Sequence, residues 1–230
     1  MTGSLVQREA LTASDRAAMF ALLDAHFQGV SFEQFTRDLE SKNFVVLVER
    51  DGRLVGFSTI LVYEAEVAAE LLTVIYSGDT IISPEAWGSP AFPRAWIHSI
   101  YELRRDHYRR GRLIWLLLTS GFRTYRLLSV FWREFYPHAG IPTPPQWQRI
   151  LDTLARDQFG DGFDAAAGIV RLEHPQQLRG WLRDVPCGRE RDAHVAFFLS
   201  CNPGHARGDE LVCISHLGPD NLTPAGRRMV

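Results

Sequence analysis

The sequence LIWLLL, residues 113–118, constrains the fold of this chain more than any other stretch. It is a short, continuous apolar run without polar alternation, which is typical of a strand buried on both faces of a sheet. Helical spacing of apolar residues precedes and follows it, over 91–112 and 124–135. We therefore predict an α/β domain in which helices cover both faces of a sheet.

Several other segments have the composition of strands. Asp51-Gly52 predicts a hairpin turn, because both residues tolerate positive φ. The acidic stretch with Glu64, Glu66 and Glu70 is expected to be a connection between strands. We predict strands over 5–11, 44–49, 54–63, 72–82, 168–172, 193–199 and 210–214, with further helices before 27 and over 31–39 and 148–159. The expected sheet is mixed and mostly antiparallel, with a strand-rich C-terminal extension.

Composition limits the possible functions. With 230 residues and 46% hydrophobic residues, the chain suits one large domain, or one domain with an extension. A net charge of −2 argues against nucleic-acid binding, and no apolar run is long enough for a membrane span. Three cysteines do not make a disulfide scaffold. We expect a cytoplasmic, bacterial protein; Lys42 is its only lysine, and we attribute the arginine bias to a GC-rich genome.

Four short motifs occur in an order that resembles the GNAT N-acyltransferase superfamily. They are Arg8–Thr12 followed by Asp15, Asp51–Gly56 (DGRLVG), Ile81–Glu85 (IISPE), and Phe135–Gly140, which begins FYP and ends in Gly. The resemblance covers about the first two-thirds of the chain. It implies a GNAT-like core over 1–145 that binds an acyl donor. Residues 146–230 would be an extension that completes the sheet and the acceptor site.

The resemblance also implies a mechanism. A thioester donor lies in a V between the strands 72–82 and 113–118, and helix-start N–H groups hold its pyrophosphate. Tyr136 protonates the leaving thiolate, while a carboxylate, for which Asp79 is our candidate, removes the proton of an amine acceptor. The acceptor is a small molecule or a peptide.

The chain departs from the family pattern after Pro84-Glu85. Only Gly88 of the expected glycine loop is present, and Pro90 and Pro93 have no N–H to donate. The donor is therefore expected to be acyl-CoA, with a longer acyl chain held differently, or an acyl-carrier-protein thioester. An acidic carrier protein could dock on the basic cluster that includes Arg104, Arg105 and Arg109, but solvated charge that matches the dipole at a helix end is the favoured explanation of this cluster.

The polar interruption Ser77-Gly78-Asp79-Thr80 is the best candidate for chemistry. Gly78 allows a β-bulge that would turn Asp79 or Thr80 toward the cleft; the alternative is a turn whose side chains bond local backbone. Arg123 could pair an anion at a helix start, or Thr124 could simply cap that helix. The predicted donor-binding residues are Ser77, Thr80, Ile82, Trp87, Gly88, Arg123 and Thr124.

Two other functions remain open from the sequence. A GNAT-like module that has lost donor binding would explain the altered loop. The spacing of Cys201, His205, Cys213 and His216 is reminiscent of a zinc site, but it lacks a C-x2-C pair, and we expect no metal.

Overall fold

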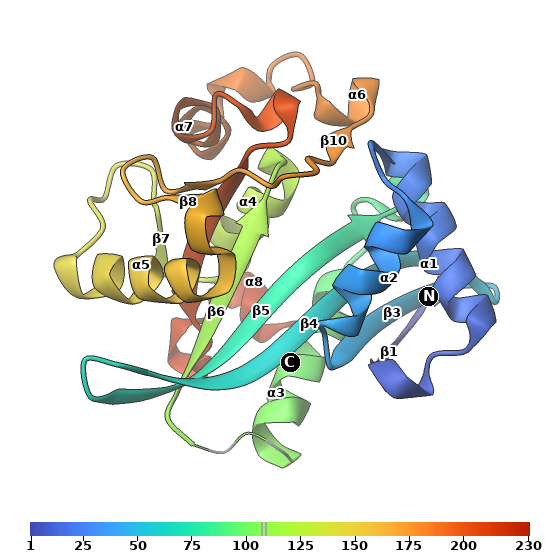
Figure 1. Ribbon diagram of the computed structural model, residues 1–230, viewed down its shortest axis with the longest axis horizontal. Helices are drawn as coiled ribbons and strands as arrows, with labels where there is room; N and C mark the ends of the chain where they lie inside the picture. Colours follow the sequence, from blue (N-terminus) through green and yellow to red (C-terminus); the bar gives the residue numbers. More distant parts are fainter. Residues whose placement is uncertain (107, 109) are drawn as a thin grey trace.

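The computed structural model describes residues 1–106, 108 and 110–230. Within this part of the chain, nine strands form one mixed sheet, in which the pair β5–β6 is parallel and the other adjacent pairs are antiparallel (Figure 1). Its path is β1 (Thr2–Gln7), β3 (Phe44–Arg50), β4 (Arg53–Val67), β5 (Glu70–Ile82), β6 (Arg112–Thr119), β11 (Glu210–His216), β9 (Ile169–Val170) and β8 (Phe163–Asp164), with β7 (Phe135–Tyr136) also on β11. The predicted fold class is confirmed.

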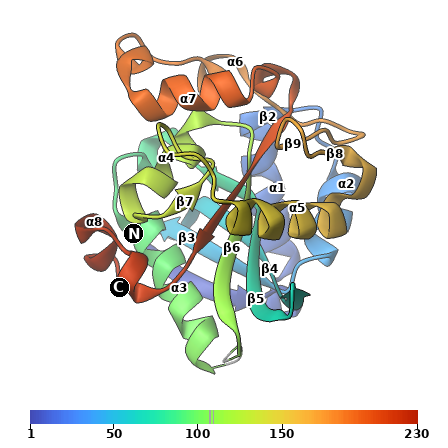
Figure 2. The same ribbon diagram turned by 90° about the vertical axis from the view of Figure 1, so that its left-hand side faces the viewer.

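Strand β6 is buried on both faces, as its apolar run predicts. Trp115 belongs to a core shared with α3 (Ala91–Asp106), α4 (Phe122–Phe131) and α7 (Ala193–Cys201). Its neighbour Leu116 belongs to a second core, with α5 (Pro145–Phe159). On the same side as α5, α1 (Ala13–His26) and α2 (Phe32–Glu40) cover the N-terminal strands, so helices lie on both faces (Figure 2). The short helix α8 (Pro224–Arg227) lies beside α4. No helix among the described residues is long and apolar enough to cross a membrane.

Two tight hairpins join the central strands. Asp51 and Gly52 adopt φ of 52° and 74°, which confirms the predicted turn between β3 and β4. The acidic connection predicted after β4 is wrong. Its glutamates lie in β4 and β5, which are joined by the two positive-φ residues Ala68 and Ala69. Glu70 pairs with Arg112 of β6 through two hydrogen bonds of 2.7 and 2.9 Å, so an apparently solvated charge helps to hold adjacent strands.

Several predicted elements differ from the structure, among them the helix expected over 91–112: α3 is Ala91–Asp106, and Arg112 begins β6. The first strand is Thr2–Gln7, and a 3₁₀ turn follows where the strand was expected to continue. The segment 193–199 is not a strand but part of helix α7, which Asp192 caps by accepting from the N–H groups of His194 and Val195. Helix α4 ends at Phe131 rather than near 135, because β7 pairs with β11 from Phe135 onward.

The C-terminal segment reaches back to the N-terminal helices. Strand β10 (Gln177–Leu178) pairs with β2 (Phe27–Gln28), which directly follows α1, and leads into the short helix α6 (Gly180–Arg183). Arg179 donates its backbone N–H to the carbonyl of His26 at 2.9 Å, and its side chain pairs with Asp24. Figure 1 shows this orange segment next to the blue N-terminal helices.

Candidate active site

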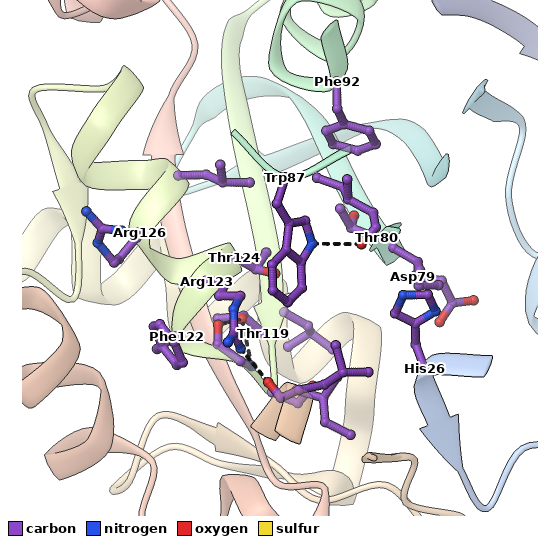
Figure 3. A pocket seen from close by; sticks show the side chains of 18 of the residues that line it. His26, Asp79, Thr80, Trp87, Phe92, Thr119, Phe122, Arg123, Thr124 and Arg126 are labelled. Atoms are coloured by element: carbon purple, nitrogen blue, oxygen red, sulfur yellow. Dashed lines mark hydrogen bonds between the residues drawn. The ribbon is translucent and has the colours of Figure 1, made fainter. Parts of the chain in front are cut away.

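A cavity opens where two parallel strands part. Strands β5 and β6 are paired from Leu72 opposite Arg112 to Ser77 opposite Leu117, and no further. Beyond this point β5 continues to Ile82 against β4, while β6 continues to Thr119 against β11. The ends of both strands line a cavity of about 790 Å³, shown in Figure 3. This parting lies where the resemblance implies a V between the two strands.

A β-bulge in β5 turns Asp79 into the cavity. Ser77 lies opposite Ile60 of β4 and Thr80 opposite Ser58, so Gly78 and Asp79 share a single partner position. As a result Tyr76 and Ile81, five residues apart, face the same side of the sheet, where an unbroken strand would place them on opposite sides. Asp79, two residues from Ile81, therefore lies on the side covered by α1, α2 and α5.

Gly78 is required at the bulge for steric reasons. A Cβ atom at this position would lie 2.8 Å from Oγ1 of Thr59 and 3.0 Å from Cε of Lys42. The absence of that atom allows the side chain of Lys42 to cross β5 next to Asp79. The glycine thus brings a cation close to the candidate base.

Two carboxyl groups from different strands are partly buried in the cavity. Burial raises the pKa of Asp79 to about 6, with Lys42 acting against the shift and Asp38 adding to it. Burial, with a smaller contribution from Asp79, raises the pKa of Glu210 to about 8. Among the described residues, neither carboxyl group has a hydrogen-bond or ion-pair partner. Near neutral pH, Asp79 is therefore mostly ionised and Glu210 mostly protonated.

Lys42 is the cation of this group. Only 9% of its surface is exposed, and its Nζ donates to the carbonyl of Asp38 at 3.1 Å and to Oγ of Ser41 at 2.7 Å. The same Nζ lies 5.2 Å from the ring centre of Tyr76. Burial lowers the pKa of Lys42, whereas the charges of Asp79 and Asp38 raise it.

His26 brings an unpaired nitrogen to the same end of the cavity. Its Nδ1 lies 2.7 Å from the carbonyl of Leu22, which accepts a hydrogen bond only if Nδ1 carries the proton. In the neutral ring, Nε2 is then an acceptor; it is buried and has no partner among the described residues. Figure 3 shows the His26 ring extending from α1 toward Asp79.

The opposite wall contains the predicted donor-binding residues. Thr80, Ile82, Trp87, Gly88, Arg123 and Thr124 all line the cavity. Trp87 donates from Nε1 to the carbonyl of Ile82 at 2.9 Å, and the Arg123 guanidinium lies 4.6 Å from the centre of the Trp87 ring (Figure 3). Arg123 also donates to the carbonyl of Leu182. Burial lowers its pKa, which indicates a cation partly removed from water.

Two other candidates lie outside the cavity lining. Ser77 is buried, and its Oγ accepts a 2.8 Å hydrogen bond from Nε1 of Trp115. Tyr136 packs on the α5 side of β11 and donates its hydroxyl to Glu134 at 3.2 Å. Burial raises the pKa of Tyr136, with Glu134 adding to the shift. The structure does not bring Tyr136 together with Asp79.

The expected phosphate loop offers few donors. The backbone N–H of Ala91, the first residue of α3, donates to Oγ of Ser89 at 3.2 Å. Pro90 and Pro93 have no N–H, so few amides at this helix start can bind phosphate.

The predicted carrier-docking cluster is only partly described. Arg104 donates to the backbone carbonyls of Tyr108, Arg110 and Gly111. These hydrogen bonds give Arg104 a structural role in the loop between α3 and β6. Arg105 pairs with Asp106. Arg109 lies outside the described residues.

The alternative metal site is not favoured by the structure. Within the described part of the chain, no group of three or more His, Cys, Asp or Glu side chains could hold a metal ion. Cys201 ends α7 and Cys213 is buried in β11, in the core on the α3 and α4 side.

Three cavity residues were not identified from the sequence. Lys42 had a usable signal, because it is the only lysine and lies two residues before a buried strand. Glu210 begins an apolar strand, and His26 ends a helix; both positions are ordinary for such residues. Only their convergence distinguishes them.

The comparisons give remote structural neighbours. No protein-family model and no curated protein matches this sequence. Among solved structures, a probable N-acyltransferase from Enterococcus faecalis is 14% identical, with 59% of this chain and 33% of that one covered and a TM-score of 0.42. Escherichia coli ElaA is 16% identical, with 60% and 93% covered and a TM-score of 0.40. N-acetylglutamate synthase from Neisseria gonorrhoeae is 16% identical, with 70% and 33% covered and a TM-score of 0.42.

Proposed function

We propose that this protein is an N-acyltransferase that moves an acyl group from a thioester donor to an amine. The observation that carries this proposal is the end of β5–β6 pairing at Ser77 and Leu117, with a large cavity and a bulged Asp79 immediately beyond. The parted strands leave room for an extended donor arm. The unpaired backbone groups of β5 supply hydrogen bonds to it.

The two walls of the cavity have different roles in this proposal. The donor lies along Ile82, Trp87 and Arg123, with its acyl carbon between the parted strands. The acceptor enters from the side of His26 and Asp79. This arrangement brings both substrates together and removes part of the entropic barrier to reaction.

The chemistry follows from the groups at the acceptor end. The neutral amine attacks the acyl carbon, a C–N bond forms and the C–S bond breaks. The proton lost by the amine passes to Asp79, which is ionised above a pH of about 6, with Nε2 of His26 as a second acceptor beside it. Backbone N–H groups of β5 stabilise the oxyanion, and the thiolate takes up a proton from water in the open cavity.

The donor follows from the altered phosphate loop. With few free amides at the start of α3, pyrophosphate contributes little to binding, which favours a donor held by its acyl chain or its pantetheine arm. Acyl-CoA and acyl-carrier-protein thioesters both meet this description. Pro90 and Pro93 also suit a binding module that has lost its donor, and the same experiment separates the two functions.

The test is acyl transfer measured by mass spectrometry, with acetyl-CoA, octanoyl-CoA and octanoyl-carrier-protein as donors and a mixture of amines as acceptors. We expect at least one donor to raise the melting temperature and to support transfer. Asp79→Asn should lower kcat/KM by roughly 10²-fold or more, because it removes the base.

Glu49→Gln provides the matched control, since this carboxylate on β3 is exposed and lies outside the cavity lining. A folded protein that binds none of the three donors would contradict the transferase and support the binding module. Full activity in Asp79→Asn would support the acyl transfer but show that Asp79 is not its base.

A further inference from the structure

The acceptor end of the cavity holds more carboxyl groups than the proposed reaction uses. One base is enough to take the proton of the attacking amine, and Asp79 fills that role. Glu210 comes from a different strand, β11, and has no hydrogen-bond or ion-pair partner among the described residues. The fixed cation Lys42 is bonded on the α2 side, to the carbonyl of Asp38 and to Ser41.

The chain itself leaves several polar groups at this end of the cavity without partners among the described residues, which is electrostatically unfavourable. Two partly buried carboxyl groups repel each other when both are ionised, and burial without partners costs free energy. The unpaired Nε2 of His26 adds a buried acceptor that also lacks a donor. Asp79 is ionised near neutral pH, and a neighbouring cation would also ionise Glu210. Together with the imidazole nitrogen, they favour a ligand that brings several N–H donors and more than one positive charge.

We propose that the acceptor is an aliphatic di- or oligoamine, which presents one amino group to Asp79 and His26 and pairs a second, ammonium group with Glu210. This assignment rests on the proposed N-acyl transfer for the fate of the first amino group. The binding of the second group depends only on the cavity. A metal ion is the competing occupant, but the described residues contain no group suited to hold one.

The proposal predicts that binding releases protons. The pKa of Glu210 is about 8 and that of Asp79 about 6, so each carboxyl group holds its proton below that pH. An ammonium group favours the ionised carboxylate, so the affinity for a diamine should rise with pH between about 6 and 8. The other titratable or charged groups that line the cavity are His26 of α1, Asp38 of α2, Lys42, Tyr76 of β5, Arg123 and Arg126 of α4, and Arg189.

Calorimetry on the full chain without donor tests the proposal. The probes are 1,4-diaminobutane, 1-aminobutane and 1,4-butanediol, which share a carbon chain and differ in charge. We expect the diamine to bind at least tenfold more tightly than the monoamine, the diol not to bind, and proton release to appear as a dependence of the heat on the buffer. Glu210→Gln should reduce diamine affinity to the level of the monoamine, and Glu49→Gln should leave it unchanged.

The Glu210→Gln variant has a second readout that needs no ligand. A carboxyl group whose pKa is raised on folding stabilises the protein below its unfolded pKa, and this contribution is lost as pH rises toward about 8. The melting temperature of the wild type, relative to Glu210→Gln, should therefore fall between about pH 5 and pH 8. This readout also shows that the variant folds.

Three results would overturn the proposal: equal affinity for diamine and monoamine, no binding of either amine, or stabilisation by Mg²⁺ or Ca²⁺ equal to that by diamine. Acyl transfer to 1,4-diaminobutane that is unaffected by Glu210→Gln would also overturn it, while leaving the transferase intact. If no donor supports transfer but the protein still binds the diamine selectively, the diamine-binding site would stand and the proposed N-acyl transfer would be wrong.

Discussion

Lys42 is the residue through which the surroundings of Asp79 are controlled. It crosses β5 at Gly78, lies over the Tyr76 ring and is held by the end of α2. Burial pushes the pKa of Asp79 up, and the charge of Lys42 pulls it down. The balance leaves Asp79 ionised at neutral pH yet basic enough to accept a proton.

Replacing Lys42 should therefore move the titration of Asp79. In Lys42→Met, which keeps most of the side-chain length but not the charge, we expect the pKa of Asp79 to rise from about 6, by roughly one unit. The acidic limb of the transfer profile should move to higher pH by the same amount. NMR titration of the Asp79 carboxyl carbon measures the shift directly, without substrates. Lys42→Arg, which keeps the charge, serves as the control; an unchanged pKa in Lys42→Met would exclude the coupling.

At the scale of the element, the bulge in β5 connects backbone geometry to chemistry. It shifts the alternation of the strand by one residue, so Asp79 lies on the side of Lys42 and Tyr76. On the other side of the sheet, Thr80 hydrogen-bonds Ser58 of β4 at 2.8 Å. The parting of β5 and β6 begins at the same point. The cavity and the position of its base, Asp79, therefore both occur at this β-bulge.

Gly78→Ala tests this element. The added Cβ would lie 2.8 Å from Oγ1 of Thr59, closer than real Cβ contacts allow, so the variant should lose about 1–3 kcal/mol of unfolding free energy. Urea denaturation measures the loss. The double variant Gly78→Ala/Thr59→Ala removes the contacting oxygen and should recover part of it. A single variant as stable as the wild type would show that the bulge tolerates a side chain.

At the scale of the whole molecule, the sheet continues through the proposed domain boundary at 145. Strand β11, from the extension, pairs with β6 from Leu211 opposite Thr119 to His216 opposite Ile114. It also supplies Glu210 to the cavity. We propose that residues 1–145 and 146–230 are two parts of one cooperative unit.

A chain ending at Pro145 should accordingly fail to fold. Without β11, strand β6 would become an exposed apolar edge, and the core residues packed by α5 and α7 would face water. Circular dichroism and gel filtration of the truncated chain measure the outcome, with the full chain alongside. A soluble chain of residues 1–145 with cooperative unfolding would instead support an independent core.

The sequence determined the features that depend on local backbone chemistry. The apolar run before Thr119 predicts a strand buried on both faces, and Asp51-Gly52 predicts the hairpin between β3 and β4. Each of these predictions depends on neighbouring residues alone. Gly78 in a polar interruption predicts the bulge for the same reason. Where tertiary contacts decide, local pattern failed: the apolar segment 193–199 is helical, and the glutamates before Ala68 lie in a strand.

Only the tertiary structure decided which groups share the cavity. Residues 26, 42, 79 and 210 are brought together by the order of β5, β6 and β11 and by the packing of α1 and α2. The same packing places Tyr136 outside the cavity lining. Sheet order and register are set by burial summed over many distant pairs, which no short motif contains. For that reason the sequence identified one carboxylate, while the structure adds a lysine, an imidazole and a second acid beside it.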